Sequence, residues 1–108
     1  MILIFALISF IEMQHIHYKI EVNIKSVKGY VPFCSFILGN IHKNAETIFS
    51  NMEGKPVNIG DCAPFQLNLA YYEKNSTTIL ATQYCSLPEL KENCHYISKE
   101  VFKILNLE

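Results

Sequence analysis

Residues 65–85 read FQLNLAYYEKNSTTILATQYC, and this stretch decides the fold. Its first half alternates between large apolar residues and polar or small ones, which is the period of a strand with one buried face. The apolar positions are Phe65, Leu67, Leu69 and Tyr71. The polar segment 73–76 then indicates a turn, and residues 77–85, rich in Thr and Tyr, indicate a return strand. The stretch therefore predicts an antiparallel hairpin.

A helix signal follows this hairpin directly. Ser86 and Glu89 have the spacing of a capping box, and Pro88 lies in the first turn, where its missing N–H costs nothing. The residues after the box carry one apolar stripe at helical spacing. Its members are Leu90, Cys94, Ile97, Val101, Ile104 and Leu105. The sequence therefore predicts a long helix that reaches nearly to the C-terminus.

The first half of the chain has the same order of signals. Residues 18–25 alternate strictly, Lys28 and Gly29 indicate a turn, and residues 30–38 are apolar on both faces. A strand that is apolar on both faces is typical of a central, covered strand or of an interface. Asn44 is the expected N-cap of a short helix that ends at Gly54, and residues 55–64 form a loop.

The predicted order is therefore ββαββα, in an α+β fold. We expect a mostly antiparallel four-stranded sheet with two helices packed on one face. Residues 13–108 form a single domain of ordinary size. The two halves share this order of elements but no repeat at the level of residues.

The N-terminal segment 1–12 is apolar, with Ser9 as the only polar side chain before Glu12. It is shorter than the roughly 20 residues of a membrane-spanning helix, and it lacks the basic start and small-residue cleavage site of a signal peptide. Three interpretations stay open: an extra strand or helix of the domain, an atypical export signal, or a gene-model artefact. We favour the last, with translation starting at Met13.

The charge composition argues against several classes of partner. The formal net charge is -1, and all nine basic residues are Lys. Arg is the preferred side chain for bidentate contacts with phosphate and guanine, so its absence disfavours phosphate chemistry and base recognition. Without a basic patch, we expect neither nucleic-acid nor membrane binding, and no cofactor motif is present.

Four cysteines give two competing hypotheses. Cys34, Cys85 and Cys94 lie within patterned elements and are predicted to be in the core, whereas Cys62 lies in the loop and is the candidate reactive thiol. We expect free thiols and a cytoplasmic protein, because an apolar core of this size needs no disulfides. The alternative is a secreted domain with two disulfides.

Metal binding has weak support. His15 and His17 lie on one side of an extended segment, and Cys94 and His95 could supply further ligands. No third ligand has a diagnostic spacing, so we expect no metal site.

The aromatic residues suggest a binding surface instead. Tyr30, Phe33, Tyr72 and Tyr84 exceed what the helix-covered face of the sheet can hold, and apolar surface left exposed usually marks an interface. The first hypothesis is a small interaction module that forms a homodimer, or binds a protein partner, through the open sheet face or an edge strand. The alternative is a small enzyme or ligand-binding protein with a site near the 55–64 loop and Cys62.

Overall fold

A computed structural model describes residues 16–58, 60 and 63–104 of this chain. The expectations for segment 1–12, Met13, His15, Cys62 and Leu105 lie outside the described residues. The described elements are β1 (Ile16–Ser26), β2 (Gly29–Gly39), α2 (His42–Ser50), β3 (Phe65–Glu73), β4 (Ser76–Cys85) and α3 (Leu87–Ile104).

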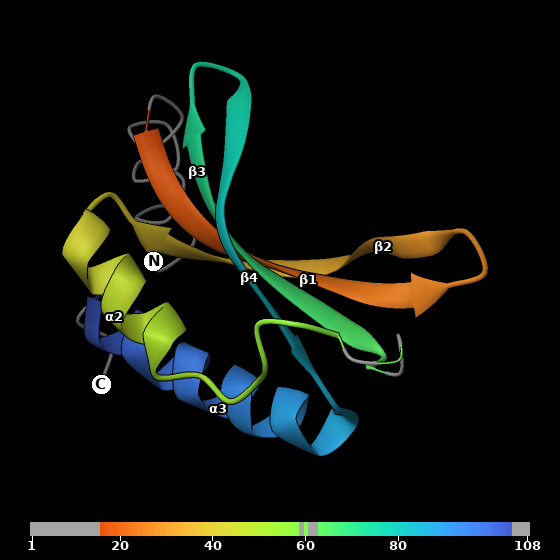
Figure 1. The fold of residues 1–108 in the computed structure, drawn as a ribbon. Coiled ribbons are helices and arrows are strands. Elements are labelled where there is room, and N and C mark those ends of the chain that lie inside the picture. Colours follow the sequence, from red (N-terminus) through yellow and green to blue (C-terminus); the bar gives the residue numbers. More distant parts are fainter. Residues whose placement is uncertain (1–15, 59, 61–62, 105–108) are drawn as a thin grey trace.

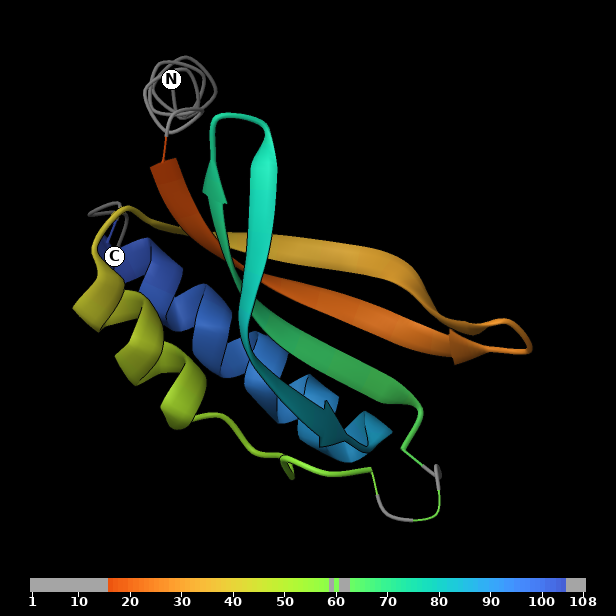
Figure 2. The same ribbon diagram turned by 45° about the horizontal axis from the view of Figure 1, so that its top comes forward.

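The four strands form one antiparallel sheet in the order β2-β1-β3-β4. The two strands of each predicted hairpin are adjacent in the sheet, and the pairing of β1 with β3 joins the two hairpins in its centre. Both helices lie on the same side of this twisted sheet, and no helix or strand of the described residues covers the other side (Figure 1, Figure 2). The prediction of an α+β fold with the order ββαββα and two helices on one face is therefore confirmed.

The core lies between the sheet and the helices. Ile20, Val22 and Leu67 have no exposed surface and point from the central strands toward the helices. Their neighbours along β1 point the other way, and there Lys19 and Glu21 form an ion pair of 3.3 Å. The alternation in the sequence thus places apolar residues under the helices and polar ones on the open face.

The second hairpin owes its tight turn to two residues in the left-handed conformation. Lys74 and Asn75 have φ angles of 48° and 67°. Two successive positive φ angles give a turn whose twist matches that of the flanking strands, and Asn tolerates this conformation better than most residues. The polar segment 73–76 therefore closes the hairpin as predicted.

The helix α2 begins earlier than the sequence indicates. It starts at His42, its N-cap is Ile41 without a side-chain cap, and Asn44 lies inside the first turn. The prediction of Asn44 as the N-cap is therefore wrong. The helix is held by its apolar stripe, since Ala45, Ile48 and Phe49 are buried against the sheet.

The capping box of α3 forms as predicted. The backbone N–H of Ser86 donates to Glu89 Oε1 at 2.8 Å, and the backbone N–H of Glu89 donates to Ser86 Oγ at 3.3 Å. Leu90 and Ile97 are buried beneath the sheet. Within the described residues, no helix is long and apolar enough to cross a membrane.

The strand β2 is an edge strand and is irregular. Its pairing with β1 skips one residue at Phe33 and another at Leu38. Cys34 is exposed, so the prediction that it belongs to the core is wrong. The reason is position: one side of β2 has no neighbouring strand among the described residues, and the apolar pattern of residues 30–38 does not mark a central strand.

Candidate functional site

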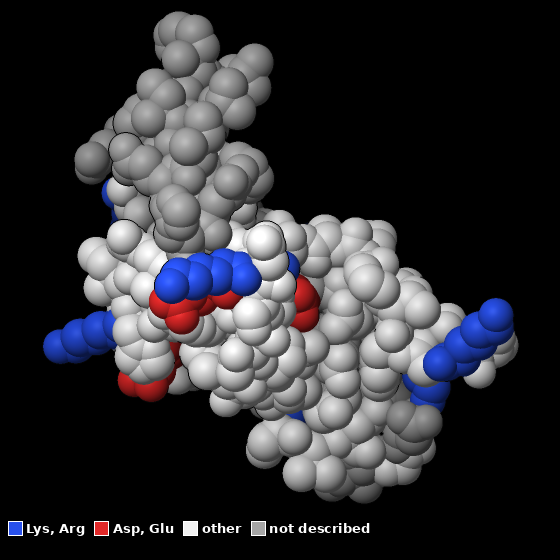
Figure 3. Space-filling model, turned by 90° about the horizontal axis from the view of Figure 1, so that it is seen from above, with Lys and Arg blue, Asp and Glu red and all other residues white. Residues whose placement is uncertain are grey.

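The centre of the open sheet face is a polar network. Gln66 Oε1 accepts hydrogen bonds from Asn23 Nδ2 at 3.0 Å and from Asn68 Nδ2 at 3.3 Å. Asn68 Oδ1 accepts a further bond from Thr82 Oγ1 at 2.7 Å. Figure 3 views this face, with charged side chains in its middle and at the tip of a hairpin. These amides bond to one another, so the centre of the face offers little apolar surface.

Two of the predicted interface residues lie together at one end of the sheet. The rings of Tyr30 and Tyr84 are 5.9 Å apart. The Tyr30 hydroxyl donates to the carbonyl of Ala63 at 2.7 Å and accepts from Asn58 Nδ2 at 2.7 Å. Both tyrosines are half-buried, and these bonds fasten the segment before β3 to the β1–β2 hairpin.

The other two predicted interface residues lie apart from this pair. Tyr72 packs against the buried His17 with a ring separation of 4.9 Å, and its hydroxyl donates to Asn75 Oδ1 at 2.8 Å. Phe33 is 61% exposed on β2. The structure therefore does not gather the four residues into one patch, and only Phe33 leaves most of its surface in solvent.

Exposed apolar side chains instead follow the β2 edge. Ten large apolar residues are exposed among those described, and five of them lie in residues 27–41, from the β1–β2 turn to the residue before α2. These five, which we call the β2 apolar row, are Val27, Val31, Phe33, Ile37 and Ile41. Apolar surface concentrated along one element is typical of a binding surface.

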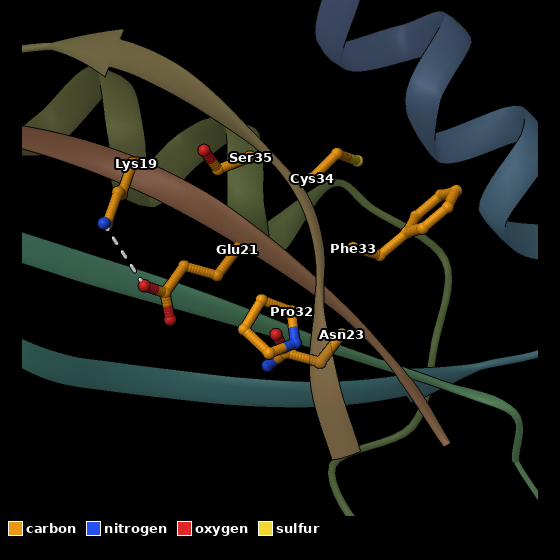
Figure 4. Close-up of a pocket in the computed structure, with 7 residues that line it drawn as sticks. All are labelled: Lys19, Glu21, Asn23, Pro32, Phe33, Cys34 and Ser35. Atoms are coloured by element: carbon orange, nitrogen blue, oxygen red, sulfur yellow. Dashed lines mark ion pairs between the residues drawn. The ribbon is translucent and has the colours of Figure 1, made fainter. Parts of the chain in front are cut away.

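A shallow hollow of about 290 Å³ lies beside this row. Figure 4 shows the residues that line it: Lys19 and Glu21 point toward each other from β1, and Phe33 and Cys34 project away from them. The skipped residue Phe33 bends β2 here. The hollow is open, and the two charged groups that line it, Lys19 and Glu21, are paired with each other. It is therefore more typical of a shallow depression in an interaction surface than of a ligand pocket.

The backbone of β2 has a defined outward side. The N–H of Lys25 donates to the carbonyl of Pro64 at 2.8 Å, on the β3 side of β1. Backbone groups alternate in direction along a strand, so Ile24, Val22 and Ile20 bond to β2. Their partners there are Val31, Cys34 and Phe36. The residues that follow Cys34 and Phe36, which are Ser35 and Ile37, therefore direct their N–H and C=O groups away from the sheet.

The opposite edge, on β4, is covered at its C-terminal end. Lys55 and Tyr84 exchange two backbone hydrogen bonds of 2.9 and 2.8 Å. Gly54 fits closely there, because a Cβ at this position would lie 2.8 Å from Gln83 Oε1 and 3.0 Å from the Tyr84 carbonyl. The segment after α2 thus occupies the outward groups of β4 where β2 has no equivalent cover among the described residues.

Asn93 fixes this covering segment and was not found from the sequence. It is 2% exposed, and its side chain makes two bonds of 2.7 Å, one to the N–H and one to the C=O of Glu53. The side-chain amide of Asn93 thus gives the backbone of Glu53 the two hydrogen bonds that a neighbouring strand would otherwise provide. An Asn on the sheet-facing side of a predicted helix, between Leu90 and Ile97, was the available signal.

The described residues of the 55–64 loop, near which the alternative hypothesis expects a site, line an open hollow of about 250 Å³. Lys55, Asn58, Tyr84 and Glu89 are among the residues that line it. Glu89 is already used in the capping box of α3. Cys62 lies outside the described residues, so the hypothesis of a reactive thiol there stays a prediction.

The remaining thiols are poorly suited to nucleophilic chemistry. Partial removal from water raises the pKa of Cys34 and of Cys94, and the charge of the Cys34 thiolate raises the pKa of Cys94 further. Burial, followed by the charges of Glu89 and Cys94, raises the pKa of Cys85 to about 11. The thiolate is the nucleophilic form, so these three residues are mostly unreactive thiols at neutral pH.

No metal-binding group emerges among the described residues, since no three His, Cys, Asp or Glu side chains converge there. His17 is buried against Tyr72, His95 is exposed on α3, and His15 lies outside the description. The expectation for His15 and His17 therefore stays untested as a pair.

Comparison with known proteins gives no match: no family model, no curated protein and no solved structure is significantly similar to this chain.

Proposed function

We propose that the protein is a non-catalytic interaction module whose binding surface is the edge of β2. The observation that supports this is the β2 apolar row, in which Phe33 and Ile37 lie next to or at the outward-directed backbone groups of Ser35 and Ile37. Strand edges of this kind bind other strands through main-chain hydrogen bonds, while neighbouring side chains give specificity. The proposed binding surface is therefore the β2 edge and not the centre of the open face, and of the four predicted interface residues it includes Phe33.

The three other aromatic residues have a structural use in this proposal. Tyr30 and Tyr84 fasten the segment before β3, and Tyr72 packs on His17. Their hydroxyl groups are engaged within the chain, so Phe33 is the predicted interface residue that keeps most of its apolar surface in solvent.

The proposal includes a cytoplasmic location. Cys85 is buried in the core and Cys94 packs against it. This use of cysteine as a small apolar side chain is ordinary in compartments that keep thiols reduced.

An apolar fluorescent dye tests whether the β2 edge is an accessible binding surface. At high dilution, we expect the folded chain to bind 8-anilinonaphthalene sulfonate, and we expect Phe33→Lys and Ile37→Lys to lower this fluorescence. Ile79→Lys, at an exposed apolar site on β4, is the matched control and should leave most of the signal. If all three variants bind the dye like the wild type, the β2 edge is not the binding surface.

A further inference from the structure

The β2 edge offers a short, flat segment for pairing. Phe33 and Leu38 are skipped in the ladder with β1, and the four residues between them, 34–37, pair regularly. Pro32 precedes this segment and has no N–H to donate. A partner strand can therefore pair with β2 over residues 34–37, through the outward groups of Ser35 and Ile37.

We infer that the partner at this segment is a second copy of the chain, with the two β2 strands antiparallel and a two-fold axis at Phe36. This inference rests on the proposed function of the β2 edge. In an antiparallel pair, two residues directly opposite each other exchange hydrogen bonds when the N–H and C=O groups of both point toward the other strand. Only an axis at Phe36 sets Ser35 of one copy opposite Ile37 of the other and, by symmetry, Ile37 opposite Ser35.

The side chains along this seam are self-complementary in size. Ile37 is 39% exposed on the open face, and in the proposed register it packs over the small Ser35 of the second copy. On the face toward the helices, the two Phe36 rings meet in a non-hydrogen-bonded pair of the ladder, where side chains come closest. An aromatic pair at that position stabilises cross-strand pairing.

The charges beside the seam do not oppose the pairing. In β1, Glu21 lies opposite Ser35 and Lys19 lies opposite Ile37. A row across the open face of the dimer therefore runs from Glu21 through Ser35 to Ile37 and Lys19 of the second copy. Each row ends in opposite charges, and the two-fold axis creates no contact between like charges. The same edge thus fits itself, as an isologous interface requires.

Sedimentation of the full chain tests the dimer, with a proline on each edge as the variant and its control. The N–H of Ser35 points outward, so Ser35→Pro keeps the ladder with β1 and removes donors from the seam. We expect the wild type to be a dimer and Ser35→Pro to raise its dissociation constant by at least about tenfold. Thr77→Pro removes an outward N–H from β4 and should leave the dimer unchanged.

A cysteine at the axis tests the register independently of proline. Phe36→Cys places two thiols directly opposite each other in the non-hydrogen-bonded pair, so mild oxidation should give a covalent dimer linked at position 36. Ser35→Cys is the control, because position 35 meets position 37 and not itself. Mass mapping of the linked peptides distinguishes these products from links through native cysteines.

The outcomes separate this inference from the proposed function. A wild-type monomer, or a dimer that neither Ser35→Pro nor Ile37→Lys weakens, overturns the second copy as the partner. Absence of the link at position 36 overturns the register. A monomer in which the amides of Ser35 and Ile37 exchange slowly with solvent also overturns it, and assigns the edge to another segment of the same chain. If the protein is a monomer but the dye still binds at the β2 apolar row, the dimer is wrong and the proposed function stands. If the dye does not bind there, the proposed function is wrong.

Discussion

The two outer strands of the sheet end in different ways. At β4, Lys55 adds two backbone bonds to Tyr84, and Asn93 holds the residue two positions earlier. At β2, the described part of the chain provides no such cover, and apolar side chains gather instead. An uncovered edge can pair with a further strand, and the segment at Lys55 removes that possibility at the C-terminal end of β4. The two edges therefore differ in where a further strand could bind.

The largest expected effect comes from removing the support of the covered edge. Asn93→Ala leaves the N–H and C=O of Glu53 without their buried partner, so we expect the free energy of unfolding to fall by about 2–4 kcal/mol. Denaturant unfolding measures this loss. Asn51→Ala is the control: it removes one exposed bond of 3.3 Å to the Tyr96 hydroxyl and should cost less than about 0.5 kcal/mol. Equal losses in the two variants would contradict the role of Asn93.

A smaller effect is expected from crowding the contact between the covering segment and β4. Gly54→Ala introduces a Cβ within 3.0 Å of the Tyr84 carbonyl, so the segment must shift and unfolding should become easier by about 1–3 kcal/mol. Because the shift uncovers β4, light scattering should also reveal species larger than those of the wild type. Lys55→Ala keeps the backbone bonds to Tyr84 and should change neither quantity. A Gly54→Ala protein that unfolds like the wild type would show that the cover is not tight.

Cysteine reactivity compares the two edges in the native protein. Cys34 on β2 is exposed, whereas Cys85 on β4 is buried with its pKa raised to about 11. Alkylation by iodoacetamide should modify Cys34 about tenfold or more faster than Cys85, since only the accessible thiolate reacts. Both rates should rise as the pH increases from neutral to alkaline, because both pKa values lie above the ordinary one. Denaturant should remove most of the difference, and a native Cys85 that reacts first would refute the assignment.

The smallest effect is expected at the open edge itself. Phe33→Ser replaces a large apolar side chain that packs little within the chain, so the free energy of unfolding extrapolated to high dilution should change by no more than about 0.5 kcal/mol. Phe49→Ala removes a buried aromatic ring from α2 and should cost about 3–5 kcal/mol in the same assay. A large loss for Phe33→Ser would mean that the residue serves the fold and not a partner.

The sequence was sufficient for the elements whose signals are local. The alternation in β1 and β3, the capping box of Ser86 and Glu89, and the polar turn at residues 74 and 75 each depend on neighbours within a few residues. The start of α2 was missed because its first turn lacks a side-chain cap, and Asn44 was the nearest residue with cap chemistry. Tertiary packing of Ala45, Ile48 and Phe49 fixes that helix instead.

The candidate site was harder to predict because it depends on strand order. The apolar residues of β2 indicated an interface or a central strand, and only the order of the sheet decides between the two. The separation of Tyr30 and Tyr84 from Tyr72 has the same origin, since their partners come from distant parts of the chain. The bonds between Asn93 and Glu53 span 40 positions, a distance over which no periodic pattern carries information.

The skipped residue Phe33 also affects which single-residue deletions the fold can tolerate. Deleting one residue from a regular strand such as β1 turns every following side chain to the opposite face and destroys the core. Deleting Phe33 would instead restore a regular ladder between the turn and Ile37, with Val31 and Cys34 keeping their partners Ile24 and Val22. The hairpin thus has one position at which a codon can be lost without loss of the fold. The straightened strand would also extend the flat edge that the proposed dimer uses, while the residues of the core keep their places.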